Sequence, residues 1–197
     1  MSKLLTTSGL YDAPVSRRGF LSGLGTAAAA GLVWASPVRA AVTPISTGGE
    51  LRDLDMFNQN TRETISTVFF CRGGYQKDSL NDLNHFLRDH HCNKSHWMDP
   101  NLLTMLYDIQ TIFDKKQIEI ISAYRAPETN AKLRHQIRGV AKDSLHMQGK
   151  AVDMRIRGVD VKMMYDVVKT LGVGGVGYHP RQNFVHLDTG PVRYWVG

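Results

Sequence analysis

The 197-residue sequence predicts a single α+β domain in which helices flank an antiparallel β-sheet. Helix-like and strand-like segments follow one another without the regular alternation of a parallel α/β fold, and short turns that often contain glycine join them. With 42% apolar and 21% charged residues, the chain has the composition of an ordinary globular protein. No internal repeat and no second domain boundary is visible, so we expect one domain.

The first forty residues are interpreted as a twin-arginine export signal. Arg17 and Arg18 lie in the segment SRRGFL, and an apolar run follows at residues 24–34. This run is shorter than the roughly 20 residues of a membrane-spanning helix, so the chain is not expected to be an integral membrane protein. Cleavage is predicted after Ala40, with Ala41 as a second choice and an uncleaved N-terminal anchor as the alternative. The predicted destination is the periplasm.

Little net charge remains after the signal. The whole chain carries +6, and residues 1–40 hold four of its 24 basic and one of its 18 acidic residues, so 20 and 17 remain and the net charge is +3. This mild excess suits an anionic polymer such as the cell wall, but it lacks the dense Lys/Arg clusters that bind nucleic acid. Cys71 and Cys92 would meet an oxidising compartment and could form one disulfide, with two buried free thiols as the alternative.

The elements can be assigned in order. Residues 41–62 are rich in Pro, Thr, Ser and Gly, which predicts an extended leader. Apolar periodicity then predicts the following segments: a strand at 65–70, a helix at 79–91 with Ser79 as its N-cap, a helix at 99–116 with Asp99 as its N-cap, a strand at 117–123, a helix at 127–136, a strand at 151–156, a helix at 161–171, and strands at 173–178 and 184–187.

Three residues have the types and placement of a metal site. His146 and Asp153 could share a helix face, but Gly149 and the β-branched Val152 between them favour a turn that enters a strand. His186 lies on a later strand. Two imidazoles and one carboxylate leave an open fourth position on a tetrahedral Zn²⁺, as in catalytic zinc sites. Such an ion would activate a water molecule and polarise a carbonyl group.

The motif S-x-H-x-x-G-x-A-x-D at 144–153, followed by F-V-H-x-D at 184–188, resembles the zinc peptidases that include D-alanyl-D-alanine carboxypeptidases, lysostaphin-type endopeptidases and the hedgehog domain. With SAYR at 122–125, GVAK at 139–142 and GGVGY at 174–178, the chain is more narrowly similar to the periplasmic murein endopeptidase K family over nearly all of its mature length. This resemblance implies a hedgehog/DD-peptidase-like fold, a zinc peptidase domain over 63–197, and hydrolysis of peptide cross-links in peptidoglycan, including those between two meso-diaminopimelate residues.

The resemblance also assigns roles to residues. His146, Asp153 and His186 match the zinc ligands, and Arg125 matches the arginine that binds a substrate carboxylate, although it could instead be a structural ion-pair partner. Ser144 and Tyr124 are further substrate-side candidates, with Tyr124 in the core as the alternative.

The general base is less clear, because relatives place an acid or a histidine where this chain has Asn183 and Phe184. We favour Asp188 as the base because it shares a strand face with His186, and His179, which follows a Gly-rich turn, could instead stabilise the transition state. Asp188 could equally orient a ligand imidazole.

Three functions fit this pattern. The first is a zinc-dependent endopeptidase that cuts the peptide stems of peptidoglycan through a metal-activated water. The alternatives are a D-alanyl-D-alanine carboxypeptidase and a zinc-stabilised cell-wall-binding module without catalysis. The missing acid at Asn183 keeps the last of these open.

Overall fold

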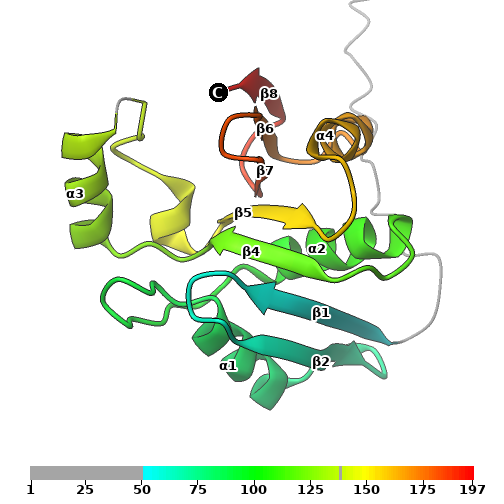
Figure 1. Cartoon of the computed structure of the whole chain (residues 1–197). Coiled ribbons are helices and arrows are strands. Elements are labelled where there is room, and N and C mark those ends of the chain that lie inside the picture. The colour runs from blue at the N-terminus through cyan, green and yellow to red at the C-terminus, as the bar shows by residue number, and fades with distance from the viewer. Residues whose placement is uncertain (1–50, 138) are drawn as a thin grey trace, which may run out of the picture. The chain divides into compact units, whose positions relative to one another are not determined.

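The computed structural model describes residues 51–137 and 139–197, and its strands form one eight-stranded sheet in the order β3-β2-β1-β4-β5-β7-β6-β8 (Figure 1). The strands are β1 (Arg52–Asn58), β2 (Thr64–Cys71), β3 (Gly74–Tyr75), β4 (Ile118–Ser122), β5 (Ala151–Ile156), β6 (Gly175–His179), β7 (Phe184–Asp188) and β8 (Arg193–Val196). Only β1–β4 and β6–β8 pair in parallel. The sheet is therefore mostly antiparallel, and the predicted α+β class is confirmed.

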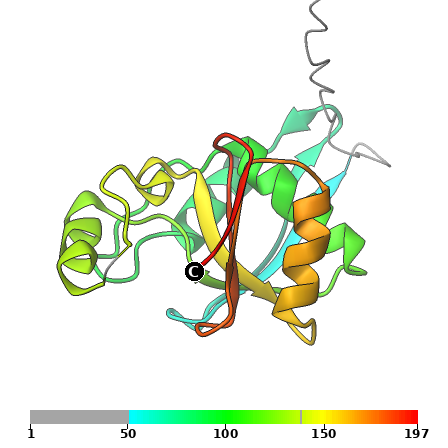
Figure 2. The same ribbon diagram turned by 90° about the horizontal axis from the view of Figure 1, so that it is seen from above.

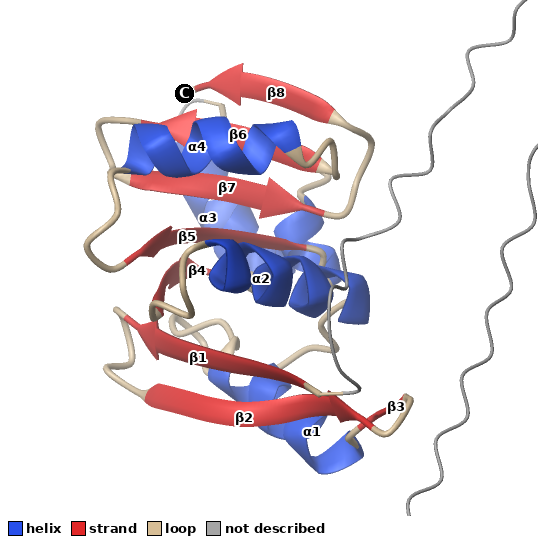
Figure 3. Cartoon of the chain, turned by 90° about the vertical axis from the view of Figure 1, so that its right-hand side faces the viewer, coloured by secondary structure: helices blue, strands red, loops and turns tan. Residues whose placement is uncertain are grey.

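In the described ranges, four helices and one short 3₁₀ turn accompany the sheet. They are α1 (Lys77–Phe86), α2 (Pro100–Ile112), α3 (Pro127–Gln136), η1 (Leu145–Gln148) and α4 (Val161–Thr170). The apolar side chains of α1, α2 and α4 form one continuous core with the inward side chains of the strands. Figure 3 shows where these helices lie along the sheet. In contrast, α3 and α4 lie on opposite sides of strands β5 to β8 (Figure 2). We call the side with α4 the core face and the other side the site face.

Strand periodicity separates the two faces. On β5, Val152 and Met154 belong to the core, so Asp153 between them points to the site face. On β7, Val185 and Leu187 belong to the core, and His186 points to the site face in the same way. Because Asp153 and His186 are directly paired across the two strands, the antiparallel register places their side chains next to each other.

Most predicted elements are present, with shifted ends. The helix α3 and the strand β5 have the predicted bounds, and α2 begins as predicted because the Asp99 side chain accepts a hydrogen bond from the backbone of Asn101. The helix α1 begins earlier and ends earlier than predicted: its N-cap is Gln76 rather than Ser79, and it stops at Phe86.

The sheet also contains strands where none was predicted. The strand β1 lies inside 41–62, the segment expected to be an extended leader, and it pairs with both β2 and β4. Its pairing partners come from distant parts of the chain, which local composition does not reveal. The short strands β3 and β8 were not predicted either.

The possible disulfide between Cys71 and Cys92 is not formed: both thiols are free, and each is half-buried. Cys71 ends β2. The helix α1 then runs back along the strand, and its last carbonyl, that of Phe86, accepts a hydrogen bond from Asn58 near the start of β2. Cys92 follows α1 and lies beyond that opposite end. The helix therefore holds the two cysteines apart.

The remaining predictions about the N-terminus fall outside the described part of the chain. The export signal at 1–40 and residues 41–50 of the expected leader belong to residues 1–50, which the structure does not describe. Among the helices of the described ranges, none combines the length and hydropathy needed to cross a membrane.

Candidate metal centre

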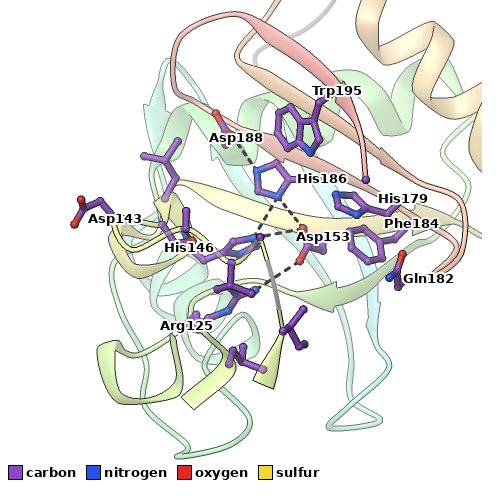
Figure 4. A pocket seen from close by; sticks show the side chains of 18 of the residues that line it. Arg125, Asp143, His146, Asp153, His179, Gln182, Phe184, His186, Asp188 and Trp195 are labelled. Carbon is purple, nitrogen blue, oxygen red and sulfur yellow. Dashed lines mark hydrogen bonds and ion pairs between the residues drawn. The ribbon is translucent and has the colours of Figure 1, made fainter. Parts of the chain in front are cut away.

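The structure brings together the three ligands predicted from the sequence (Figure 4). His146 comes from η1, Asp153 from β5 and His186 from β7. His186 Nδ1 lies 2.8 Å from Asp153 Oδ1 and 3.3 Å from His146 Nε2. The third side of this triangle, from His146 Nε2 to Asp153 Oδ1, measures 3.4 Å.

These distances fit a small tetrahedral cation. Ligand atoms at about 2.0–2.2 Å from a zinc ion stand roughly 3.3–3.5 Å from one another in a tetrahedron, and two of the three distances, 3.3 and 3.4 Å, fall in this range. The shorter 2.8 Å contact is a charge-assisted hydrogen bond in which His186 Nδ1–H donates to Asp153 Oδ1. Two imidazole nitrogens and one carboxylate are also the donor set of catalytic zinc sites that keep a fourth position open.

His146 is held by its backbone turn and by one ring hydrogen bond. Its Nδ1–H donates to the carbonyl of Ala123 at 2.7 Å, so Nε2 is the nitrogen with a lone pair for the metal. The Ser144 hydroxyl caps η1 by accepting from the His146 backbone. Gly149 ends η1 with φ of 65°, and a Cβ at this position would stand 2.1 Å from the Trp97 carbonyl oxygen. Only glycine fits this tight return into β5.

His186 is held by Asp188, whose side chain is fully buried. The imidazole Nε2–H donates to Asp188 Oδ2 at 2.9 Å, which leaves Nδ1 for the metal. Both Asp188 oxygens have other donors as well: Arg193 reaches them at 3.0 and 2.6 Å, and the backbone amides of Gly175 and Gly190 donate to Oδ1. Both oxygens of the Asp188 carboxylate therefore already accept several hydrogen bonds.

Protonation of the centre follows from these contacts. Burial alone would lower the pKa of His186, but hydrogen bonds to Asp153 and Asp188 raise it to about 9 in the absence of metal. Burial alone would raise the pKa of Asp153, but His146 and His186 outweigh it and hold this pKa far below its ordinary value. Without metal, the centre is therefore an imidazolium between two carboxylates.

The three ligands lie in the wall of a pocket of about 610 Å³ on the site face. Arg125 enters from the loop after β4, and its Nη2 lies 3.8 Å from Asp153 Oδ2. His179 stacks on Phe184 with ring centroids 4.5 Å apart, and Trp195 lies 5.2 Å from the His186 ring. The far side is lined by apolar residues of α3 and the loop after it, including Leu133 and Val140. The pocket thus offers both charged and apolar contacts to an extended substrate.

Comparison with known proteins gives the family. The family model described as peptidoglycan L,D-endopeptidase MepK matches residues 46–195. The chain belongs to this family.

Curated relatives extend the match. The peptidoglycan L,D-endopeptidase MepK of Escherichia coli K12 is 43% identical over 145 residues, which cover 73% of this chain and 80% of that protein. The protein of the same name from Shigella flexneri has the same identity and coverage. The probable peptidoglycan L,D-endopeptidase MepK of Haemophilus influenzae is 45% identical over 148 residues, or 74% of this chain and 80% of that protein.

The other predicted site residues divide into two groups. Arg125, Ser144, His179 and Asp188 all line the pocket of this MepK family member. Tyr124 is not among the lining residues. Its ring instead stacks on His96 at 4.7 Å, and it packs against the core. Its neighbour Arg125 instead lines the pocket from the loop after β4, where its backbone amide donates to the His146 carbonyl.

Arg193, a pocket residue that the sequence did not indicate, lies on β8 together with Trp195. Arg193 binds Asp188, and the Arg193 guanidinium also lies 5.1 Å over the ring of Trp195. The alternation of R-Y-W-V at the end of the chain was a weak signal for a strand. Nothing in that local pattern indicates that the strand pairs in parallel with β6, which is what brings both side chains beside His186.

Proposed function

We propose that this chain is an exported zinc endopeptidase that hydrolyses peptide cross-links of peptidoglycan. Membership of the MepK family makes it a metallopeptidase that acts on peptidoglycan. The relatives are named L,D-endopeptidases, and we extend this bond preference, including cross-links between two diaminopimelate residues, to the present chain. The observation that carries the proposal is the triangle of His146, Asp153 and His186 in the wall of an open pocket.

Zinc is the metal that this donor set favours, with His146 Nε2, His186 Nδ1 and a carboxylate oxygen of Asp153 as its ligands. When bound, a zinc ion supplies a Lewis acid that polarises a substrate carbonyl and lowers the pKa of a coordinated water toward about 7. With the metal bound, Asp153 would no longer share a proton with His186, and its other oxygen would remain near Arg125.

Asp188 and His179 have different roles in this proposal. Asp188 accepts from His186, Arg193 and two backbone amides, so we assign it to orienting the ligand imidazole rather than to proton transfer. His179 lines the pocket, and its ring faces the ligand cluster (Figure 4). Burial lowers the pKa of His179, which keeps the ring neutral near pH 7. A neutral imidazole can take a proton from the attacking water and pass it to the departing amine.

Arg125 and Ser144 lie on the substrate side. The Arg125 guanidinium is largely buried at 14% side-chain exposure and is held near Ser122 and Asn130, each at 3.4 Å. Its planar fork is suited to a carboxylate of the peptide stem. Ser144 lines the pocket while it caps η1, so its hydroxyl hydrogen remains available to a substrate carbonyl.

The two alternative functions are less well supported. The relatives are named as endopeptidases, which does not favour trimming of a terminal D-alanine. A binding module without catalysis would not need a neutral histidine beside a metal position that is open to the pocket.

Digestion of purified murein fragments tests this function. Cross-linked dimers should be shortened to monomers by the protein and left intact when a chelator is present. Release of D-alanine alone would support the carboxypeptidase, and an unchanged digest would support the binding module. The His146→Ala variant should lose both zinc and activity, and His135→Ala, on the exposed end of α3, is the matched control. Stoichiometric zinc in His146→Ala would refute the ligand assignment.

We also propose the periplasm as the site of action, reached by the twin-arginine route. The proposal rests on Arg17-Arg18 and the apolar run after them. Replacement of both arginines by lysine should leave the precursor in the cytoplasm, as fractionation would detect. Export of the double-lysine variant at the normal level would argue against this route.

A further inference from the structure

A second charged cluster lies on the site face, outside the pocket. Glu119 of β4 is paired in register with Arg155 of β5, two residues beyond the ligand Asp153, so Arg155 and Asp153 point to the same face. The Glu119 side chain is only 10% exposed, and its carboxylate accepts from Arg155 Nε at 2.7 Å and Arg157 Nε at 2.9 Å. Gln59 donates a third hydrogen bond at 2.9 Å. We call Arg155, Arg157 and Glu119 the arginine cluster.

The Glu119 carboxylate accepts hydrogen bonds from the Nε atoms of both arginines. Within residues 51–137 and 139–197, no carboxylate or carbonyl pairs with the terminal Nη atoms of Arg155 or Arg157. The side chains are 30% and 58% exposed, so these ends reach solvent. Burial alone would raise the pKa of Glu119, but hydrogen bonds from both arginines lower it, so the anchor stays charged. The Nη1/Nη2 ends of the two guanidinium groups, here called terminal forks, therefore face solvent. The hydrogen bonds at Nε hold them in position.

The surroundings add positive charge and an apolar support. Phe57 of β1 is the next residue in the same row across the sheet, because it pairs with Glu119. The Arg157 guanidinium lies 5.6 Å over its ring, and that of Arg62 lies 5.2 Å over it. The strands β1, β4 and β5 run side by side here (Figure 1). Two guanidinium groups thus share the one carboxylate of Glu119, and Arg62 adds a positive charge over the neighbouring Phe57 ring, which leaves a local excess of positive charge that favours an anion.

We propose that the arginine cluster binds a carboxylate of the peptide stem whose cross-link is cut at the metal centre. This inference rests on the proposed function and identifies a further substrate contact. The outward forks match the planar, bidentate geometry of a carboxylate. Along β5, a rise of about 3.3 Å per residue places the backbone of Arg155 about 7 Å from that of Asp153, and Arg157, just past the end of the strand, lies up to about 13 Å away. An extended substrate has a similar rise, so the carboxylate lies about two to four residues from the scissile bond.

The test compares two cross-linked stem-peptide dimers that differ only at that carboxylate, which is free in one and amidated in the other. The wild-type protein should prefer the acid by about tenfold in kcat/KM, as expected for a charge-assisted bidentate contact. Arg155→Gln and Arg157→Gln should each reduce this preference, and the double variant should nearly abolish it. Arg72→Gln, on the exposed turn between β2 and β3, is the control and should keep it.

A conservative variant separates binding from folding. In Arg155→Lys the charge remains, but one ammonium group cannot both hold Glu119 and present a fork, so most of the preference should be lost. Thermal unfolding of each variant checks the fold. If the double variant is folded and keeps the wild-type preference, the cluster only joins β4 and β5, and the inference is wrong while the endopeptidase proposal stands.

A binding measurement covers the case in which neither dimer is cut, which would count against the endopeptidase proposal. Calorimetry with an uncross-linked stem peptide, free or amidated at the same carboxylate, needs no cleavage. Tighter binding of the acid by the wild type, lost in the double variant, supports the arginine cluster as a carboxylate site. Equal binding of acid and amide by the wild type refutes it.

Discussion

The two ring nitrogens of His186 contact two different carboxylates, and this division decides which nitrogen can bind a metal. Nε2 contacts Asp188 at 2.9 Å, and Nδ1 contacts Asp153 at 2.8 Å. Without metal, both nitrogens carry a proton because the two acids raise the pKa of the ring to about 9. A metal ion must therefore displace the proton on Nδ1.

Zinc binding should consequently depend on pH. Below pH 9 the Nδ1 proton competes with the metal, so the affinity should rise about tenfold per pH unit toward the pKa and then level off. Above the His186 pKa of about 9 no proton remains to be displaced from this ring. Chelator-competition titrations between pH 6 and 10 would measure this slope. An affinity independent of pH over this range would show that His186 is already neutral without metal.

Loss of the carboxylate behind His186 should weaken metal binding. In Asp188→Asn the imidazole loses its charged acceptor and Arg193 loses its ion pair, so zinc affinity should fall by about 10- to 100-fold. Asp166→Asn, which removes an exposed carboxylate paired only with Lys162, is the matched control. Competition with a fluorescent chelator would report both affinities. Wild-type affinity in Asp188→Asn would argue against a positioning role.

Loss of His179 should lower the rate of catalysis without weakening metal binding. Its removal in His179→Ala takes away a proton carrier but no ligand, so kcat should fall by about 100- to 10,000-fold while the zinc content stays at the wild-type level. Steady-state kinetics on cross-linked dimers, combined with metal analysis, would separate this variant from Asp188→Asn. An unchanged kcat would exclude His179 as the proton carrier.

At the scale of elements, the centre depends on a short turn and a strand pair. The turn η1 carries His146 into position, and Gly149 then returns the chain into β5, which carries Asp153. Antiparallel pairing of β5 with β7 places His186 directly opposite Asp153. The parallel strand β8 supplies Arg193 behind this pair. Each ligand is thus placed by backbone geometry, with few degrees of freedom left to its side chain.

The return at Gly149 should tolerate no side chain. In Gly149→Ala the new Cβ would meet the Trp97 carbonyl oxygen at 2.1 Å in a backbone with φ of 65°. We expect a loss of more than about 3 kcal/mol in the free energy of unfolding and a reduced zinc content. Gly158→Ala is the control, because its φ of 73° is similar but nothing lies within 4 Å of the added atom. That variant should lose only about 1–2 kcal/mol, as denaturant unfolding would show.

At the scale of the whole described domain, one face of the sheet packs the hydrophobic core and the other face carries the candidate site. The core face is apolar and joins α1, α2 and α4, whereas the site face holds the metal centre, the pocket and the arginine cluster. The metal ligands come from three segments up to 40 residues apart along the chain. A bound ion would therefore add a further connection between these segments.

Metal should stabilise the folded protein measurably. An ion that binds only the native state, at a free concentration of about 1,000 times its Kd, adds about 4 kcal/mol to the free energy of unfolding. The midpoint of thermal unfolding should thus rise with zinc and fall with chelator. His146→Ala should lose this shift and His135→Ala should keep it. Equal midpoints of the wild type with and without zinc would contradict native-state binding.

Local pattern was enough to predict several elements and the three residues that meet at the candidate metal centre. The Asp99 cap of α2, the proline at the start of α3 and the apolar alternation of β5 lie within or next to each segment, and residue type and spacing mark His146, Asp153 and His186 as candidate ligands. Such features depend on neighbours along the chain, which is why the sequence by itself determined them.

Only the tertiary structure decided which distant groups meet. The strand β1 pairs with β4 about 60 positions later, the free Cys71 and Cys92 end up apart, and Arg193 binds Asp188 behind a metal ligand. Glu119 likewise meets Arg155 and Arg157 only through the register of β4 and β5. Strand order and helix packing produce these contacts, and both depend on burying the whole core together rather than on any one segment.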